Sequence, residues 1–252
     1  MRLLVLALAA CAGGSLGFVA PGSCTRNSSG FKGRLPVSIS TLQDRQQQQL
    51  PVSIRSCRTR RCGDAYLINA AHAWAQLRHL KEEVVGNSTV LQLDAPTVFP
   101  GQGRSASQLM IRDAYRDLFD RMVGFLACSG ECCILLGSPG IGKSFMLYFI
   151  MWLVALEGGT VVYDRFDEDK VLVFTRTHVS KGPATAFGGT LGQPDTWCVL
   201  IRGTLWTASN YPFAKTVLVS SPDYKIWKNA SKRIGAKIWY MPSWSDEEIM
   251  DC

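Results

Sequence analysis

The chain has 252 residues, of which 47% are hydrophobic and 19% are charged. This composition can fill a buried core, so it excludes a wholly disordered chain, a collagen and a disulfide-stapled knot. The net charge of +7 lies in the first quarter, because residues 1–62 carry nine basic side chains and one acid, Asp44. Residues 63–252 carry 18 basic and 19 acidic side chains. They therefore have no direct nucleic-acid signature, since binding to a phosphate backbone needs an excess of positive charge.

Residues 1–17 have the form of a cleavable signal peptide. Arg2 precedes a short apolar run, and small residues at Ser15 and Gly17 supply a cleavage site. The run is shorter than the roughly 20 residues that cross a bilayer, so we expect no transmembrane helix. The alternative is a buried N-terminal strand.

Residues 18–62 are expected to be a disordered segment like a transit peptide. They are poor in acids and rich in arginine and serine, which is typical of organelle transit peptides. After the expected cut the chain begins Phe18-Val-Ala-Pro, which resembles the bipartite presequences of algae with complex plastids, above all dinoflagellates. The resemblance implies delivery to a plastid through the secretory route. The alternative is a secreted protein with a disordered basic arm.

Residues 63–104 are expected to form an N-terminal helix and a linker. Apolar residues at helical spacing predict a helix over residues 64–84, which the glycine at position 86 ends. A second helix is expected from residue 106 to residue 127, with Ser105 and Gln108 as a capping box. Its apolar stripe is formed by Ile111, Tyr115, Leu118, Phe119 and Met122. It would open a domain that covers residues 105–252.

Short apolar runs alternate with helices in the rest of the chain. Twelve consecutive apolar residues, 145–156, predict a buried core helix that is too short to span a membrane. A shorter helix is expected over residues 224–233. Strands are predicted at residues 132–136, 160–163, 171–174, 197–201, 216–219 and 237–240. This alternation predicts an α/β fold with a mostly parallel sheet that is covered on both faces.

One motif carries specific chemistry. Residues 137–144 match the pattern G-x-x-x-x-G-K-[ST], between a predicted strand and a predicted helix. Glycines let the backbone curl so that its N–H groups face inward, and the dipole of the following helix adds positive potential. The alternative is a chance match in a glycine-rich loop. The motif predicts that ATP is bound by Gly137, Ser138, Pro139, Gly140, Ile141, Gly142, Lys143, Ser144 and Phe145.

Two of these side chains have specific expected roles. The Lys143 ammonium should contact the β- and γ-phosphates and act in catalysis, and the Ser144 hydroxyl should ligate Mg²⁺. Hydrolysis usually also needs an acid at the end of a neighbouring strand, but the strand predicted at residues 197–201 is followed by Arg202. Arg202 either touches phosphate or is a surface loop residue. Ser220 is expected to act as a γ-phosphate sensor, with a plain turn before Pro222 as the alternative.

An acidic cluster follows the strand predicted at residues 160–163. Asp164, Asp167 and Asp169 stand where small-molecule P-loop kinases often keep acids. A solvated hairpin tip explains the cluster equally well.

Several ordered motifs within residues 107–252 resemble the P-loop domains of crinkler and retrotransposon-hot-spot (RHS) type proteins. They are found at residues 136–144, 197–201, 214–222 and 239–249. The resemblance implies a three-layer P-loop NTPase sandwich of the additional-strand class, which is AAA+- and STAND-like. Family members usually carry Asp where this chain has Arg202, which implies a degenerate Walker B site. Many members continue into an effector domain, so we expect the domain to be truncated at its C-terminus.

The leading functional hypothesis is an ATP-binding switch with weak or absent hydrolysis, whose nucleotide state acts on a protein partner or a missing C-terminal effector domain. Its expected cofactors are ATP and Mg²⁺, and whether it is an ATPase stays open. One alternative is a small-molecule P-loop kinase that uses Asp164. Another is a nucleotide-binding interaction module that does not hydrolyse.

Overall fold

The computed structural model describes residues 62–102, 106–128, 132–165, 170–201, 214–232 and 235–250, all within the compact unit Ile39–Cys252. The predicted signal peptide and most of the transit-like segment, residues 1–61, lie outside these ranges. So do Ser105, Asp167, Asp169 and Arg202. No helix among the described residues is long and apolar enough to cross a membrane.

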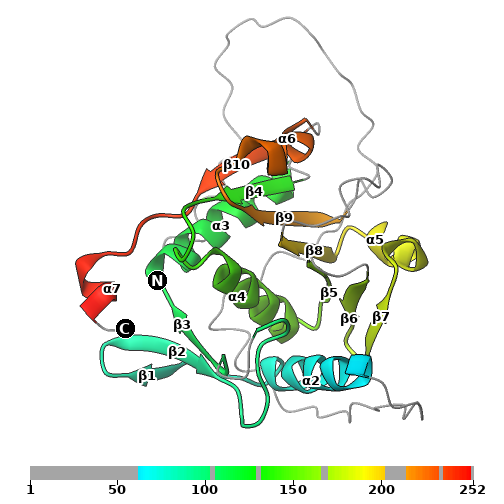
Figure 1. Ribbon diagram of the computed structural model, residues 1–252, viewed down its shortest axis with the longest axis horizontal. Helices are drawn as coiled ribbons and strands as arrows, with labels where there is room; N and C mark the ends of the chain where they lie inside the picture. The colour runs from blue at the N-terminus through cyan, green and yellow to red at the C-terminus, as the bar shows by residue number, and fades with distance from the viewer. Residues whose placement is uncertain are drawn as a thin grey trace, which may run out of the picture. The chain divides into compact units, whose positions relative to one another are not determined.

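A seven-stranded sheet forms the centre of the described residues (Figure 1), in the order β10-β4-β9-β8-β5-β6-β7. Neighbouring strands from β10 to β5 are parallel, and β5, β6 and β7 pair antiparallel. The predicted α/β fold with a mostly parallel sheet is therefore confirmed. The strands are β4 (Cys132–Leu136), β5 (Thr160–Arg165), β6 (Val171–Phe174), β7 (Val179–Gly182), β8 (Thr196–Ile201), β9 (Lys215–Ser220) and β10 (Ala236–Tyr240).

Helices pack on both faces of this sheet. One face shares a buried cluster with α2 (Cys62–Leu77), α3 (Asp113–Cys128) and α4 (Lys143–Leu156). The other face packs against the short helices η1 (Ala184–Phe187) and α5 (Gly188–Leu191) and against α6 (Tyr224–Ser231). A last helix, α7 (Asp246–Met250), follows β10.

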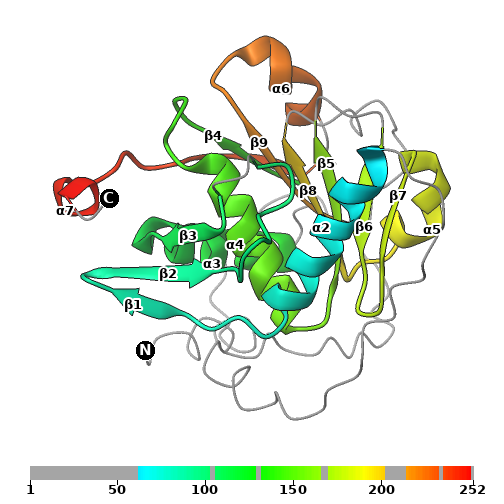
Figure 2. The same ribbon diagram turned by 60° about the horizontal axis from the view of Figure 1, so that its bottom comes forward.

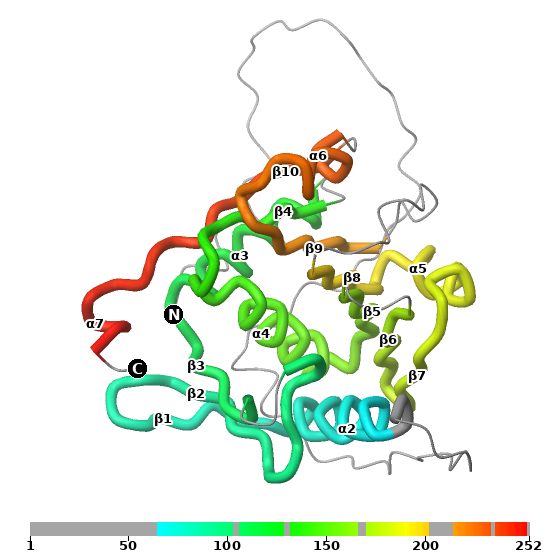
Figure 3. Tube along the Cα trace, in the orientation of Figure 1, coloured from blue at the N-terminus to red at the C-terminus, as the bar shows by residue number. Residues whose placement is uncertain are grey.

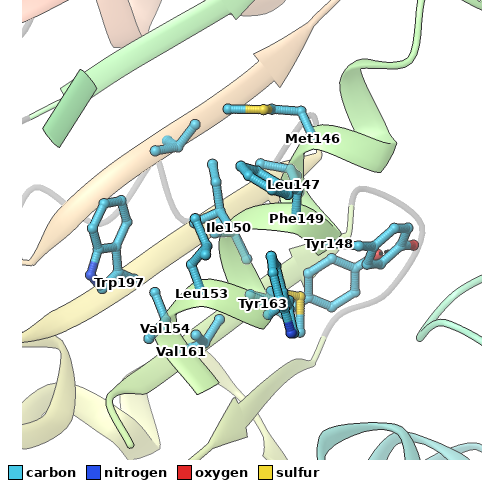
Figure 4. Close-up of a cluster of buried hydrophobic side chains, with 14 of the residues drawn as sticks. Met146, Leu147, Tyr148, Phe149, Ile150, Leu153, Val154, Val161, Tyr163 and Trp197 are labelled. Carbon is cyan, nitrogen blue, oxygen red and sulfur yellow. Dashed lines mark hydrogen bonds between the residues drawn. The ribbon is translucent and has the colours of Figure 1, made fainter. Parts of the chain in front are cut away.

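The helix α4 is the centre of the larger cluster. All ten of its residues from Met146 to Ala155 are buried. Figure 4 shows residues 146–150, Leu153 and Val154 of this helix together with Val161, Tyr163 and Trp197 of the sheet. A helix that is apolar all round needs cover on every side, and here α2, α3 and the sheet supply that cover. The predicted core helix is thus confirmed, and its first residue lies directly after the glycine-rich loop.

The first predicted helix is too long, because α2 ends at Leu77 and residues 83–85 form a strand. A small antiparallel sheet follows α2, made of β1 (Glu83–Val85), β2 (Ser88–Gln92) and β3 (Gln108–Ile111). Gly86 has a φ of 62° in the two-residue turn between β1 and β2, a conformation that glycine readily adopts. Valines at the end of β1 favour a strand over a helix. Figure 2 shows this hairpin extending away from α2 and α4.

The second predicted helix begins too early. Residues 108–111 form β3, and α3 begins at Asp113, so Gln108 does not cap it. Within β3, Leu109 and Ile111 are buried while Gln108 and Met110 are not, which is the period of two of a strand with one face on the core. The helical stripe that sequence spacing predicted is real from Tyr115 onward, where α3 buries one face.

Candidate functional site

The loop of residues 137–142 joins β4 to α4 at the carboxyl edge of the parallel strands (Figure 3). In sheets of this kind ligands bind at that edge. Gly140 has a φ of 79° and Gly142 a φ of 95°, which side-chain-bearing residues rarely adopt. At Gly142 space also excludes a side chain, because a Cβ atom would collide with the hydroxyl of Tyr115. Glycine at position 142 is therefore required by both backbone and packing.

The side chain of Lys143 closes the loop on itself. Its Nζ donates to the carbonyl oxygens of Gly137 and Ser138, each at 2.7 Å. Partial burial lowers the pKa of this ammonium group from its usual 10.5. The motif lysine thus supplies a positive charge inside the loop, and it occupies two carbonyl oxygens that would otherwise repel an anion.

Two residues of the α3 region hold the rear of the loop. The Arg112 guanidinium donates from Nη1 to the carbonyl of Ile141 at 2.9 Å, and the Tyr115 hydroxyl donates to the carbonyl of Gly142 at 2.9 Å. Both side chains are almost fully buried. The carbonyl oxygens of residues 137, 138, 141 and 142 therefore all accept hydrogen bonds from the protein's own donors.

The first turn of α4 presents its backbone N–H groups without a side-chain cap. Gly142 is the N-cap residue, and as a glycine it has no side chain that could cap the helix. The first N–H groups of a helix have no partner within the helix, and they carry the positive end of its dipole. Ser138, Pro139 and Gly140 are exposed, so the outer side of the loop is open to solvent. A loop with occupied carbonyls and open N–H groups is suited to bind an anion.

The remaining motif residues are partly buried in the first turn of α4. Ser144 lies beside Lys143 in that turn. Phe145 packs against the core, with its ring 6.2 Å from that of Tyr148. Phe145 can therefore serve a ligand only through its backbone, whereas Ser144 can offer its hydroxyl.

Ser220 ends β9 directly beside the loop. Its register partner in β4 is Leu136, the residue before the loop. The side chain is buried, and its Oγ has no hydrogen-bond partner among the described residues. Burying a hydroxyl without a partner costs free energy, so Ser220 is a candidate to contact a ligand bound at the loop.

Asp164 lies away from the glycine-rich loop. It belongs to β5, pairs in register with Leu200 and is fully buried, so the solvated hairpin tip is wrong for this residue. The strands β9 and β8 separate β5 from β4. Three strand spacings amount to roughly 14 Å, which puts Asp164 outside contact distance of the loop.

Sequence reasoning missed Arg112 and Tyr115. Tyr115 was recognised only as part of an apolar stripe, and Arg112 belongs to no motif. Glu248, which pairs with Arg112 at 2.9 Å, stands three residues after Ser245. That spacing is a capping-box signal that sequence alone contains, but it says nothing of Arg112.

Fold and loop together define a class in coarse terms: an α/β protein with a mostly parallel sheet and a glycine-rich loop at its carboxyl edge. The chain is similar to Crinkler effector protein 15 and Crinkler effector protein 16 of Phytophthora infestans. Each is 26% identical over 152 residues, which cover 56% of this chain and 24% of the relative. The match thus spans about a quarter of the length of these curated relatives. No protein-family model matches the chain.

Proposed function

We propose that the chain is an ATP-binding, P-loop NTPase-like domain that acts as a nucleotide-dependent switch with weak or absent hydrolysis. One observation carries this proposal: the carbonyl oxygens of the loop are occupied by Lys143, Arg112 and Tyr115, while the start of α4 is uncapped. Polyphosphate needs N–H donors and positive charge at the same place. The partial match to crinkler effectors is consistent with this reading.

The residues of the loop fit a bound triphosphate with Mg²⁺. Backbone N–H groups of the loop and of the first turn of α4 would face the phosphate oxygens. Lys143 uses two of its three N–H donors on the loop carbonyls and would direct the third to the β- and γ-phosphates. The hydroxyl of Ser144 would hold Mg²⁺, whose charge offsets that of the phosphates. Ser220, with its orphaned hydroxyl beside the loop, would sense the γ-phosphate.

The order of the strands supports the additional-strand class. One strand, β9, lies between β4, which precedes the loop, and β8, the strand that would carry the acid for hydrolysis. The residue after β8 is Arg202, outside the described ranges. A carboxylate at that position would anchor Mg²⁺ and orient water. Without it ground-state binding should survive better than turnover.

Nucleotide binding is tested by calorimetry with Mg·ATP on the full chain and on Lys143→Ala. Loss of a charge-assisted contact should lower the affinity roughly 10- to 100-fold. The matched control is Lys81→Ala. Lys81 is exposed and follows Leu80, whose carbonyl oxygen accepts a hydrogen bond from Trp152 near the other end of α4. The nine helical steps from Lys143 to Trp152 span about 14 Å, so Lys81 lies far from the loop. Equal affinities of wild type and Lys143→Ala would refute the proposal.

Hydrolysis is tested by phosphate release from the wild type, Arg202→Asp and Lys143→Ala. We expect negligible turnover in the wild type and a measurable rate in Arg202→Asp. Turnover of about 1 per second or faster in the wild type, abolished by Lys143→Ala, would show that the site is not degenerate. The same assay separates the switch from the non-hydrolysing interaction module, for which no variant should gain a rate.

The kinase alternative has weaker support, because Asp164 is fully buried and β5 is three strands from β4. A kinase would need this carboxylate at the γ-phosphate. The proposed partner, a protein or a C-terminal effector domain, rests on the crinkler resemblance.

For residues 1–62 we propose a presequence that directs the chain to a plastid through the secretory route, on the strength of their composition. A reporter fused to these residues should enter the secretory route. Loss of plastid entry in Phe18→Ala, with secretion intact, would support the two-step version. A reporter that stays in the cytosol would refute it, and one that is secreted would support the secreted alternative.

A further inference from the structure

Arg112 lies between the glycine-rich loop and the segment that follows β10. Only 1% of its surface is exposed. On the loop side Nη1 donates to the carbonyl of Ile141. On the other side Nη2 donates to the carbonyl of Ser243 at 2.8 Å and to that of Pro242 at 3.3 Å. One guanidinium group therefore joins two stretches of chain that are 100 residues apart in sequence.

Glu248 completes the surroundings of this buried charge. Its two carboxylate oxygens accept from Nε and Nη2 of Arg112, each at 2.9 Å, in a bidentate pair. The hydrogen bond from Arg112 is the main cause that lowers the pKa of Glu248 below its usual 4.5. A buried guanidinium is costly unless it is paired and fully hydrogen-bonded. The place of Arg112 therefore depends on Glu248 as much as on the loop.

The same segment also touches the loop directly. The ring of Trp244 stacks on the Arg112 guanidinium, with 4.2 Å from the guanidinium carbon to the ring centroid. An atom of that ring lies 3.7 Å from the position that a Cβ on Gly142 would take. Ser245 and Glu248 form a reciprocal capping box, with 2.9 Å from the Ser245 nitrogen to a Glu248 oxygen. Through Arg112, hydrogen bonds thus link the loop to the segment that leads into α7.

We propose that Arg112 is a positioning residue for the glycine-rich loop and that it couples the segment 242–248, including the start of α7, to the bound nucleotide. The inference rests on the proposed function for the identity of the ligand. Coupling of two sites is reciprocal: if the segment sets the loop for nucleotide, nucleotide also fixes the segment. The segment is thus the element whose position would report the nucleotide state of the switch.

Two substitutions compare the Arg112–Glu248 ion pair with a second ion pair, Arg116–Glu82. Glu248→Gln removes the charge opposite Arg112, and Glu82→Gln breaks the pair between Glu82 and Arg116, which are 2.8 Å apart. Arg116 lies on the first turn of α3 and contacts no loop residue through this pair. Both are conservative changes at partly exposed carboxylates. A difference in loop behaviour between the two variants therefore depends on which ion pair is broken and not on a general loss of stability.

The first measurement needs no nucleotide. Amide hydrogen exchange in the full-length chain should become faster over residues 137–143 in Glu248→Gln, and it should stay at the wild-type rate there in Glu82→Gln. Ser245→Ala removes a cap of α7 and keeps the ion pair, so it should accelerate exchange at the loop to a smaller extent. It replaces Glu248→Gln as the test variant if Glu248→Gln folds poorly. Unchanged exchange at the loop in both variants, or equal acceleration in Glu82→Gln, would overturn the inference.

The second measurement uses Mg·ATP. Its affinity should fall roughly tenfold in Glu248→Gln, within the usual range of coupling between sites, and stay unchanged in Glu82→Gln. ATP should also change the tryptophan fluorescence of the wild type. Most of that change should be absent in Trp244→Phe, whose own ATP affinity is measured in parallel by calorimetry. Normal binding by Glu248→Gln together with unaltered exchange would overturn the inference but leave the proposed function intact. Failure of the wild type to bind ATP would overturn the proposed function, and the exchange experiment would still decide the role of Arg112.

Discussion

The two halves of the glycine-rich loop have opposite surroundings. Ser138, Pro139 and Gly140 are exposed, and a Cβ atom added to Gly140 would meet nothing within 4 Å. Ile141 and Gly142, in contrast, are held through their carbonyl oxygens by Arg112 and Tyr115. The loop therefore has a fixed rear, Ile141 and Gly142, and a solvent-accessible front, residues 138–140. A loop of this kind keeps its geometry by itself, because the protein's own donors hold its carbonyl oxygens.

The largest expected effect comes from replacing the two glycines with positive φ. Gly142→Ala should lower the free energy of unfolding by roughly 3 kcal/mol, because it adds left-handed strain and a collision with the Tyr115 hydroxyl. Gly140→Ala adds the strain alone and should cost about 1 kcal/mol. Urea denaturation of both variants gives the comparison. Equal losses would mean that the rear of the loop is not packed more tightly than the front.

Next in size is a pH effect on nucleotide binding through Lys143. Burial lowers the pKa of this lysine from 10.5, and phosphate oxygens attract its charged form. Affinity for Mg·ATP should therefore fall as the pH rises through the lowered pKa, toward the level of Lys143→Ala. Lys143→Arg stays charged throughout and should give a flat profile over the same range. A flat wild-type profile up to pH 10.5 would contradict a direct contact between Lys143 and phosphate.

A smaller effect separates two buried tyrosine hydroxyls. Tyr115→Phe removes the donor to Gly142, and Tyr148→Phe removes the donor to Pro100, whose carbonyl also accepts from Tyr163. Each change should cost about 1 kcal/mol of stability. Calorimetry should show weaker ATP binding for Tyr115→Phe alone. Equal binding by both variants would show that the rear contact does not shape the loop.

The smallest expected effect is acid sensitivity at Glu248. Its pKa is lowered from 4.5, mainly by the hydrogen bond from Arg112, so its contribution to stability is complete above pH 4.5 and is lost as the pH falls through the lowered value. The stability difference between wild type and Glu248→Gln should hence be constant above pH 4.5 and shrink below it. If this stability difference stays constant down to the pH of acid unfolding, the charge of Glu248 does not stabilise the protein through Arg112.

The centre of the sheet was predictable because its strands are short apolar runs with clear ends. β4 and β6 match the predicted ranges, and the predicted ranges of β5, β8, β9 and β10 fall short by one to two residues. The strands of the small sheet were not predictable in the same way. Ile111 fits a helical stripe with Tyr115 as well as a strand, and only pairing with β2 makes residues 108–111 a strand. Local pattern is decisive where burial is complete and ambiguous where one face is exposed.

The sequence by itself determined the β4–loop–α4 unit. Glycines with the required backbone freedom, an apolar strand and an apolar helix are all adjacent in the chain, so no distant contact is needed to specify them. Only the tertiary structure decided what surrounds the loop. It placed Asp164 three strands away, buried the hydroxyl of Ser220 beside Leu136, and brought Arg112 and Glu248 together across 136 residues. Such contacts depend on how strands order and helices pack, and no local pattern of residues records that arrangement.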